Sequence, residues 1–481
     1  MKYSKILSLL LSSLLVLSLC TGCWQTPPEG TTIPSQPTQT QPSTSPTQPT
    51  QPGTHPTEPA TQPTTPPTEP PTVPTEPPTE PPTVPTEPPI VKESTATIGA
   101  TGDILMHELV IASGYDKTTG LFNYDNIFHL FSQYTSSVDY AVANLEVTLI
   151  QKDETSGFHG YHGYPSFNSP DEVAVALKTA GFDMLLTANN HSYDTKHAGF
   201  IRTQEVIRDL GLAHIGTRLS EDVKPYKVVD VNGIRIGMIN YTYNTKQTEE
   251  GIVRLNGHTL TAADSKLVNS FNYYQRDLFY ETLASQIEDM KADGAEAIVL
   301  YIHWGTEYVT EPDWWQKKMA QPLCDLGIDV IVGNHAHVIQ PVELLTSTTD
   351  ENHKTLCLYS TGNAVSNIYK SEKHPVTTED GMLFTFTFAK YSDGTVVVES
   401  ADVLPTWVYR YDEQDVRKFK ILPLDDTVED WKTALGISNS VLKKCQDSYQ
   451  RTVDTVGPGL EIANTWFAQH QAEVEAALGV Q

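Results

Sequence analysis

The segment IDVIVGNHAH, residues 328–337, joins an apolar run to a cluster of polar side chains. Residues 328–332 are typical of a buried strand, because β-branched residues dominate them. A Gly-Asn pair then permits a turn, and His335 and His337 follow two residues apart. Two imidazoles at this spacing reach one cation if the backbone turns there, and in a regular strand they would share a face. The segment therefore predicts a strand that ends in a metal-binding loop.

From Ser94 onward, short β-rich runs like this one alternate with helical patterns. Such alternation predicts a layered α/β domain. Runs at 382–389 and 395–404, separated by a turn at 392–394, predict an antiparallel hairpin. Residues 424–480 are expected to be mainly helical, with a break at 457–459, and to form either a closing helical subdomain or a packed C-terminal extension. The expected strands are 95–101, 138–143, 182–187, 227–231, 234–240, 296–302, 328–332 and 355–360, and the expected helices are 170–180, 198–210, 274–293 and 314–326.

Polar clusters follow six of the expected strands, and ligands in α/β folds gather at the carboxyl ends of strands. Each cluster alone has a structural alternative, such as a turn, a helix cap or a satisfied core histidine. Taken together they offer a mixed oxygen and nitrogen ligand set, which predicts a divalent Mn, Fe or Zn ion. A carboxylate such as Glu146 can bridge two ions. The candidate ligands are Asp103, Glu146, Asn190, His303, His335 and His337.

The first 23 residues indicate export. Two lysines precede an uncharged, largely apolar run over residues 6–20, which predicts a signal peptide. The run is shorter than the roughly 20 residues that cross a bilayer. Residues 19–23, Leu-Cys-Thr-Gly-Cys, are similar to a bacterial lipobox and predict a lipid on Cys23. Plain secretion or an uncleaved anchor stays open, because a cysteine stands where the lipobox usually has leucine. The chain is therefore expected to be extracytoplasmic and attached to the cell membrane.

Residues 24–92 have the composition of a linker. Of the 33 prolines, 23 lie between Pro27 and Pro89, and the sequence TEPPTVPTEPP occurs at both 68–78 and 79–89. Such a sequence cannot bury a core, and its prolines favour extended polyproline II. We therefore expect a disordered stalk or passive spacer over 24–92, an α/β domain over 93–423 and a helical C-terminal extension over 424–481.

Charge and cysteine usage narrow the function further. The net charge is −27 and no cluster of Lys and Arg is present, which excludes a typical nucleic-acid binder. Beyond the export signal, Cys324, Cys357 and Cys445 form an odd, widely spaced set rather than a disulfide framework. They are expected to pack as small apolar side chains.

In order and spacing, the motifs resemble the bacterial capsule synthesis protein family CapA, also called the poly-γ-glutamate capsule or PgsA-type family. That family is similar to calcineurin-like metallophosphoesterases. The resemblance covers about residues 96–368 and implies a metallophosphatase-like sandwich of two mixed β-sheets flanked by helices. The motifs that carry it are Gly102-Asp103, Asn144-Leu145-Glu146, Phe167-Asn168-Ser169-Pro170, Ala188-Asn189-Asn190-His191 with Asp194, His303-Trp304-Gly305-Thr306-Glu307-Tyr308, residues 333–341 and residues 359–363.

The resemblance also implies roles for single residues. Asp103 and His337 would hold one ion, and Asn190, His303 and His335 a second, with Glu146 bridging them. His191 would act as the acid toward the leaving group, and Glu307 would orient His303 or contact substrate. The expected substrate contacts are Asn144, Asn168 and Asn363.

Two positions depart from the pattern. Metallophosphoesterases have a histidine two residues after the first aspartate, where this chain has Leu105, with His107 nearby. The family's Phe-Arg-x-Pro segment has Asn168 in place of arginine, so a cation that would grip an anionic substrate is missing.

Three functions fit these features. The first is a metal-dependent hydrolase of phosphoester or amide bonds in a cell-envelope polymer such as a capsule. The second is a non-catalytic accessory component that assembles with the capsule-polymer machinery at the membrane. The third is a stalked adhesin whose imidazoles are structural, which would contain no metal.

Overall fold

The computed structural model describes residues 90–150, 157–425 and 432–478. The expected signal peptide, the lipidation site Cys23 and the expected linker up to residue 89 lie outside the described residues. Within the described ranges, no helix is both long enough and apolar enough to cross a membrane.

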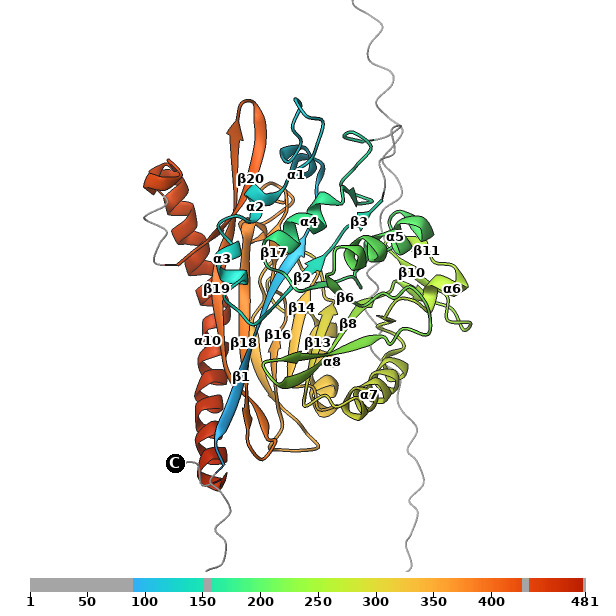
Figure 1. Ribbon diagram of the computed structural model, residues 1–481, viewed down its shortest axis with the longest axis vertical. Coiled ribbons are helices and arrows are strands. Elements are labelled where there is room, and N and C mark those ends of the chain that lie inside the picture. Colours follow the sequence, from blue (N-terminus) through green and yellow to red (C-terminus); the bar gives the residue numbers. More distant parts are fainter. Residues whose placement is uncertain (1–89, 151–156, 426–431, 479–481) are drawn as a thin grey trace, which may run out of the picture. The chain divides into compact units, whose positions relative to one another are not determined.

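Two large mixed sheets form the centre of the domain (Figure 1). The first has eight strands in the order β20-β19-β18-β1-β2-β5-β6, with β17 beside β1. Strand β1 is parallel to β2 and β17 but antiparallel to β18. Its strands are β1 (Lys92–Ile104), β2 (Tyr140–Leu145), β5 (Met184–Leu186), β6 (Ala213–Ile215), β17 (Asn363–Val365), β18 (Asp380–Tyr391), β19 (Val396–Glu413) and β20 (Val416–Pro423).

The second sheet has seven strands in the order β12-β8-β13-β14-β16-β15, with β7 beside β8. Strands β8, β13, β14 and β16 are parallel, and β7 and β15 run antiparallel to their neighbours. Its strands are β7 (Tyr226–Val231), β8 (Ile234–Tyr243), β12 (Ser270–Phe271), β13 (Ala297–His303), β14 (Val330–Asn334), β15 (Val342–Thr346) and β16 (Lys354–Leu358).

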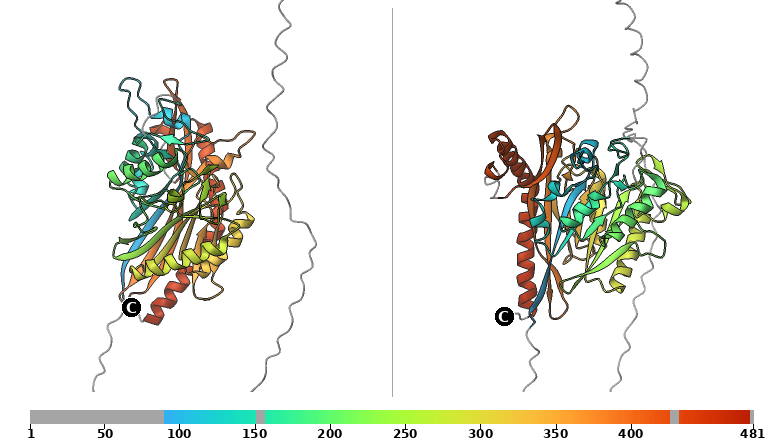
Figure 2. Two further views of the ribbon diagram at one scale, coloured as in Figure 1. Left: turned by 90° about the vertical axis from the view of Figure 1, so that its right-hand side faces the viewer. Right: turned by 45° about the horizontal axis from the view of Figure 1, so that its top comes forward.

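Helices cover the outer face of each sheet (Figures 1 and 2). Against the first sheet pack α1 (Glu108–Ser113), α2 (Asp125–Phe128), α4 (Glu172–Thr179) and α5 (Lys196–Asp209). Against the second pack α7 (Arg276–Ala292) and α8 (Trp314–Asp325). The remaining elements are α3 (Ser132–Thr135), β3 (Thr148–Leu149), β4 (Asn168–Ser169), β9 (Lys246–Gln247), β10 (Val253–Leu255), β11 (His258–Thr259), α6 (Ala262–Ser265) and the 3-10 helix η1 (Val376–Glu379).

Strand β13 shows why its sequence is apolar almost throughout. Successive side chains of a strand point to opposite faces. Val299 and Tyr301 therefore enter the core between the two sheets, whereas Leu300 and Ile302 enter the core beneath α7 and α8. A strand that is buried on both faces requires apolar residues at every position. The predicted sandwich of two mixed sheets flanked by helices is confirmed, as are the predicted strands, helices and hairpin.

Most of the described part of the C-terminal extension is one long helix, α10 (Asn439–Leu478), which runs alongside β19 of the first sheet (Figure 1). It also packs against β15 of the second sheet, and its apolar side chains enter the core between the two sheets. The expected break at 457–459 is wrong, because the helix continues through Pro458. Proline removes only one helical hydrogen bond, and burial of Val456 and Leu460 on either side holds the helix against the sheets.

The three cysteines outside the export signal, Cys324, Cys357 and Cys445, are free and buried. Each belongs to an apolar cluster, so the prediction that they pack as small apolar side chains is confirmed.

Candidate metal centre

Three polar side chains meet in the first sheet, where Asp103 and Asn144 lie near the carboxyl ends of β1 and β2 and Asn363 begins β17. Asp103 of β1 is paired with Asn144 of β2 on one side and with Asn363 of β17 on the other. The Asn144 side-chain nitrogen donates to Asp103 Oδ1 at 2.7 Å. Gly102 makes this arrangement possible, because a Cβ there would lie 1.9 Å from the carbonyl oxygen of Gly362. All three polar side chains are buried.

The second sheet contributes three histidines at the same edge. His303 is the last residue of β13, and the chain turns sharply after β14. His335 and His337 have φ angles of 95° and 55°, in a region that residues other than glycine rarely adopt. Strained backbone of this kind clusters at functional sites. As a result the two imidazoles diverge. The His335 ring lies beside that of His303, tilted at 53° with 4.7 Å between centroids, and His337 Nδ1 is 3.1 Å from Asp103 Oδ2.

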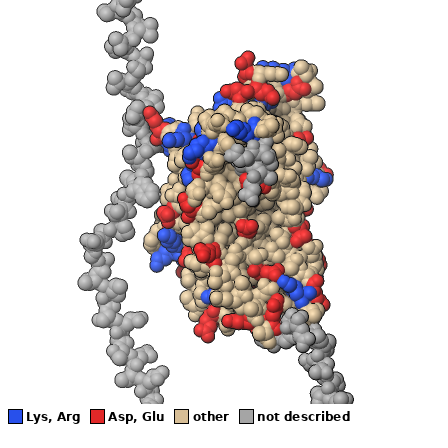
Figure 3. Space-filling view, turned by 90° about the vertical axis from the view of Figure 1, so that its left-hand side faces the viewer, with Lys and Arg blue, Asp and Glu red and all other residues tan. Residues whose placement is uncertain are grey.

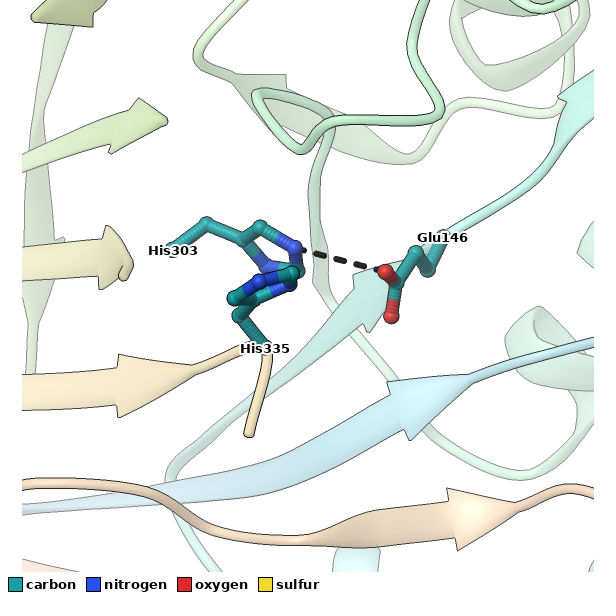
Figure 4. A group of neighbouring side chains, drawn as sticks. All are labelled: Glu146, His303 and His335. Atoms are coloured by element: carbon teal, nitrogen blue, oxygen red, sulfur yellow. Dashed lines mark ion pairs between the residues drawn. The ribbon is translucent and has the colours of Figure 1, made fainter. Parts of the chain in front are cut away.

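Glu146, which directly follows β2, lies between these two groups. Ligand atoms of Glu146, His303 and His335 are all within 4.8 Å of one another, and so are those of Asp103, Glu146 and His337 (Figure 4 shows the first group). His303 Nε2 is 3.3 Å from Glu146 Oε1 and 2.9 Å from Asn190 Oδ1. The two groups therefore share a single carboxylate.

The donor set fits a divalent cation. Both carboxylate oxygens of Glu146 and Nδ1 of His335 are buried without a hydrogen-bond partner in the described part of the chain. A buried carboxylate with no partner is costly unless a cation compensates it. Carboxylate, amide and imidazole donors without thiolate are the ligands that Mn, Fe and Zn share.

Electrostatics in the centre point the same way. Burial and the neighbouring negative charge of Asp103 raise the pKa of Glu146 well above its ordinary value. Burial alone would also raise the pKa of Asp103, but the hydrogen bond and charge of His337 hold it below its ordinary value. The pKa of His337 is raised, because the pairing with Asp103 outweighs burial. Of the two carboxylates in the site, His337 stabilises Asp103, and no cationic side chain of the site stabilises Glu146.

The other two histidines are suited to be neutral ligands. Burial lowers the pKa of His303 to about 3 and that of His335 well below its ordinary value. Metal ions bind the neutral imidazole, so ligands of low pKa do not have to lose a proton first.

His191 forms a hydrogen-bonded pair with Asp194 beside the centre. His191 Nδ1 lies 2.7 Å from Asp194 Oδ2, which also accepts from the backbone N–H of Phe167. Asn256 donates to Asp194 Oδ1 at 2.9 Å and to the carbonyl of Pro165 at 3.0 Å. These two hydrogen bonds use both hydrogens of the Asn256 amide, so Asn256 has none left to donate to His191 Nδ1. His191 Nδ1 therefore carries a proton and donates it to Asp194. Nε2 of His191 is then left to exchange a proton with a substrate.

Residues 97–368 match the family described as bacterial capsule synthesis protein PGA_cap. The match covers more than half of the 481 residues and includes every residue of the centre. The chain belongs to this family. Strands β18 to β20 and helix α10 lie beyond the matched residues.

Two relatives come from Bacillus species. The chain is 27% identical over 279 residues to the capsule biosynthesis protein CapA of Bacillus anthracis, covering 56% of this chain and 59% of that protein. It is 26% identical over 311 residues to the PGA biosynthesis protein CapA of Bacillus subtilis (strain 168), covering 63% of this chain and 70% of that protein. The match thus spans about three fifths of the first relative.

Within this PGA_cap member, Asn144 and Asn363 contact the candidate ligands. Besides Asp103, Asn144 lies 3.4 Å from His303 Nδ1, and Asn363 Oδ1 is 3.1 Å from His337 Nδ1. Both amides are buried. They therefore hold the ligands in place, and the substrate contacts expected of them stay a prediction.

Asn168 is not brought into the centre. Its Oδ1 accepts from the backbone N–H of Ile150, and its Nδ2 donates to the carbonyl of Gly160. Both polar atoms thus tie neighbouring backbone segments together. The structure assigns this side chain to the loop that carries Phe167.

The remaining predicted positions lie at the margin of the centre. Glu307 is exposed and makes no hydrogen bond to His303 within the described ranges, and its expected contact with substrate stays a prediction. Leu105 is buried in the core of the first sheet. His107 packs edge-on against Phe167 at 5.2 Å, and burial lowers its pKa to about 3. It belongs to neither ligand group, so it does not replace the missing histidine.

Sequence reasoning assigned no role to Asp194, Asn256 or Tyr243. The Tyr243 ring is stacked parallel to His303 and lies 4.8 Å from the ring of His335. Asn256 occupies the turn between β10 and β11 with a φ of 40°. The Asn-Gly pair at 256–257, flanked by short strands, is a recognisable hairpin signal, although its contact with Asp194 is long-range.

Proposed function

We propose that this chain is a membrane-anchored, extracytoplasmic protein of capsule, poly-γ-glutamate or other envelope-polymer biosynthesis, and that it hydrolyses a bond with the aid of a divalent cation. Membership of the PGA_cap family and the names of the two Bacillus relatives support the biosynthetic role. The lipobox-like sequence before Cys23 supports the anchor.

The observation that carries the catalytic part is Glu146. Its carboxylate is buried between His303 and His335 on one side and the Asp103–His337 pair on the other, and neither oxygen has a hydrogen-bond partner among the described residues. A structural carboxylate would be paired, because leaving it unpaired destabilises the fold. A carboxylate that serves as a metal ligand needs no such partner.

The residues have separate tasks in this reaction. Asp103 and His337 would hold a cation on one side of Glu146, and Asn190, His303 and His335 would hold one on the other. A bound cation supplies Lewis-acid polarisation of the bond that is cleaved. His191 donates a proton from Nε2 to the leaving group, while Asp194 fixes its ring and stabilises the imidazolium. Proton donation of this kind contributes about 10²–10⁴-fold in rate.

The test combines metal analysis with hydrolysis by the full-length protein. Wild type, His303→Ala and His335→Ala would be compared in elemental analysis and in turnover of an aryl phosphate and of poly-γ-glutamate with Mn²⁺ added. We expect bound metal and activity in wild type, and loss of both in the variants. His197→Ala is the matched control, because this exposed imidazole pairs with Asp264 outside the centre. Equal activity in wild type and in His335→Ala would refute a metal-dependent hydrolase.

A second candidate is an accessory role without catalysis, and one observation favours it. Leu105 places a buried aliphatic side chain where metallophosphoesterases have a histidine, so one ligand group is a residue short. Under this role, cells that carry His335→Ala would make normal amounts of polymer, and the variant would still co-purify with the polymer machinery. Loss of polymer in that single variant would favour chemistry.

A further inference from the structure

A cavity of about 260 Å³ lies where the end of β6, the start of β7 and the connecting loop 216–225 meet, outside the metal centre. Its remaining wall is Asn269, which precedes β12. None of the candidate metal ligands lines it. The lining residues are His214, Ile215, Gly216, Thr217, Arg218, Val223, Lys224, Pro225, Tyr226, Lys227 and Asn269.

Every ionisable side chain on this wall other than Tyr226 is basic, and none is acidic. Lys224 is neutralised by Asp293 at the rim. Lys227 makes no ion pair or side-chain hydrogen bond in the part of the chain that the structure describes. Arg218 has no ion pair there either, and donates only to neutral acceptors on Asn269 and Lys266.

This concentration of unpaired positive charge is unusual for the protein. The chain has a net charge of −27, and on the face that Figure 3 shows, acidic side chains occur throughout, even where basic ones gather. Burial and the positive charges of Lys227 and Arg208 lower the pKa of His214 to about 4. Burial likewise lowers the pKa of Arg218. Like charge therefore contributes to the His214 shift, whereas the Arg218 shift comes from burial, against the opposing charge of Glu221.

The guanidinium of Arg218 is held in place before any ligand arrives. Asn269 accepts from Arg218 Nη1 at 3.0 Å, and its own amide donates to the carbonyls of Pro225 and Asn240. Asn269 is therefore fixed with its oxygen toward Arg218. Arg218 Nε is buried without an acceptor within the described ranges. A preorganised guanidinium loses less entropy on binding an anion.

We propose that this cavity is a binding site for a small oxyanion, a phosphate or a single carboxylate group, held by Arg218 and Lys227 with the His214 ring beside them. Its volume accommodates such a group but not a folded partner or a polymer segment. The site does not depend on the hydrolase proposal, since it shares no residue with the metal centre.

The cavity also lies directly behind the segment that leads to Asn190 and His191. Thr217 on its wall bonds Thr187 through their hydroxyls at 2.7 Å. A Cβ on Gly216 would lie 2.5 Å from the backbone nitrogen of Ala188, so the two segments are in close contact. An anion in the cavity would therefore contact Gly216 and Thr217, which in turn pack against the segment that leads to the ligand and the acid.

Calorimetric titration of the full-length protein with inorganic phosphate tests the site. A second titration with L-glutamate tests whether a carboxylate group binds instead. We expect saturable binding of at least one of the two, and the tighter one identifies the source of the oxyanion. Lys227→Gln should weaken it about tenfold or more, because one charge-assisted hydrogen bond is lost. This variant removes no contact within the described part of the fold, and Arg218→Lys, which keeps the charge but not the fork, provides a second measurement.

Two controls separate this site from its surroundings. Binding should persist in His335→Ala, which removes a candidate ligand from the metal centre. Arg208→Gln, whose arginine pairs with Asp209 and does not line the cavity, should change the affinity by less than about twofold. Absence of saturable binding to either anion would overturn the proposal, as would equal affinity in wild type and Lys227→Gln. Loss of binding in His335→Ala alone would assign the anion to the metal centre instead.

Discussion

At the scale of single residues, the charge of Glu146 distinguishes a metal centre from a buried polar cluster. Glu146→Gln preserves the side-chain shape but removes the anion that would sit between two ligand groups. After chelation we expect the variant to be at least as stable as wild type, because an unpaired buried carboxylate is costly. With Mn²⁺ at about 100 times its Kd, only wild type should gain about 2.7 kcal/mol of stability. Thermal unfolding with and without the ion measures both.

Glu343→Gln provides the comparison for this experiment. Glu343 is an exposed carboxylate of β15 that accepts a hydrogen bond from Tyr359 and belongs to neither ligand group. Its substitution should leave the response to Mn²⁺ unchanged. An equal Mn²⁺ response in wild type and Glu146→Gln would contradict the placement of a cation at Glu146.

The candidate ligands were predictable because each follows an apolar strand, and strand ends converge in an α/β fold. The family resemblance implied that His335 and His337 belong to two different ligand groups, but the spacing of the two histidines did not predict it. Their spacing in a regular strand predicts a shared face, and only the left-handed backbone at both residues separates them. Substrate contact by Asn168 stays a prediction, and its hydrogen bonds were not predictable from the sequence. A polar residue next to a motif gives no sign that its amide is already used by the backbone of Ile150 and Gly160.

At the scale of elements, the contact between α10 and β15 depends on one glycine of the pair that suggested a helix break. A Cβ at Gly459 would lie 1.9 Å from the carbonyl oxygen of Val342, whereas one at Gly457 would meet nothing closer than 3.7 Å. We expect Gly459→Ala to destabilise the fold by about 1–3 kcal/mol through overpacking. Gly457→Ala should instead stabilise it by up to about 1 kcal/mol, because alanine favours helix. Urea unfolding of both variants checks the prediction, and equal effects would contradict the packing.

Strand β6 gives rise to a pH dependence through His214. Its pKa is about 4 in the fold, because of burial and of Lys227 and Arg208, against an ordinary value of 6.5. Between these values the unfolded chain binds a proton that the folded chain does not, so stability is lost as the pH falls from 6.5 to 4. The loss is about 3 kcal/mol at most.

His214→Gln removes this titration and should flatten the stability profile in that window. Unfolding free energies of wild type and variant at pH 7, 5.5 and 4 measure the difference between them. The difference should grow as the pH falls, whatever other groups titrate in both proteins. Addition of phosphate at pH 5.5 should reduce it, since an oxyanion beside His214 favours the protonated ring. Parallel profiles for the two proteins would show that His214 has an ordinary pKa.

At the scale of the whole molecule, the sequence predicted a helical C-terminal region but not what it does. Amphipathic periodicity identifies a helix but does not say which elements its apolar face packs against. In this fold the apolar face of α10 packs against strands from both sheets. The sequence left open a separate closing subdomain or a packed extension. The structure shows the second, with Val456, Leu460 and Phe467 in the core between the sheets.

A chain that ends at residue 425 should therefore fail to fold, although residues 97–368 alone carry the family match. Burial of Val456, Leu460 and Phe467 stabilises the fold by about 1.5–3 kcal/mol each. Loss of Arg451, which pairs with the buried Asp380 at 2.6 Å, leaves that carboxylate uncompensated at a cost of about 3–5 kcal/mol. Together these terms equal the whole stability of a typical domain, about 5–15 kcal/mol. Phe467→Ala alone should cost only about 3–5 kcal/mol and leave a folded protein. Circular dichroism and urea unfolding distinguish the two, and a cooperative transition in the truncated chain at the wild-type midpoint would show that α10 is dispensable.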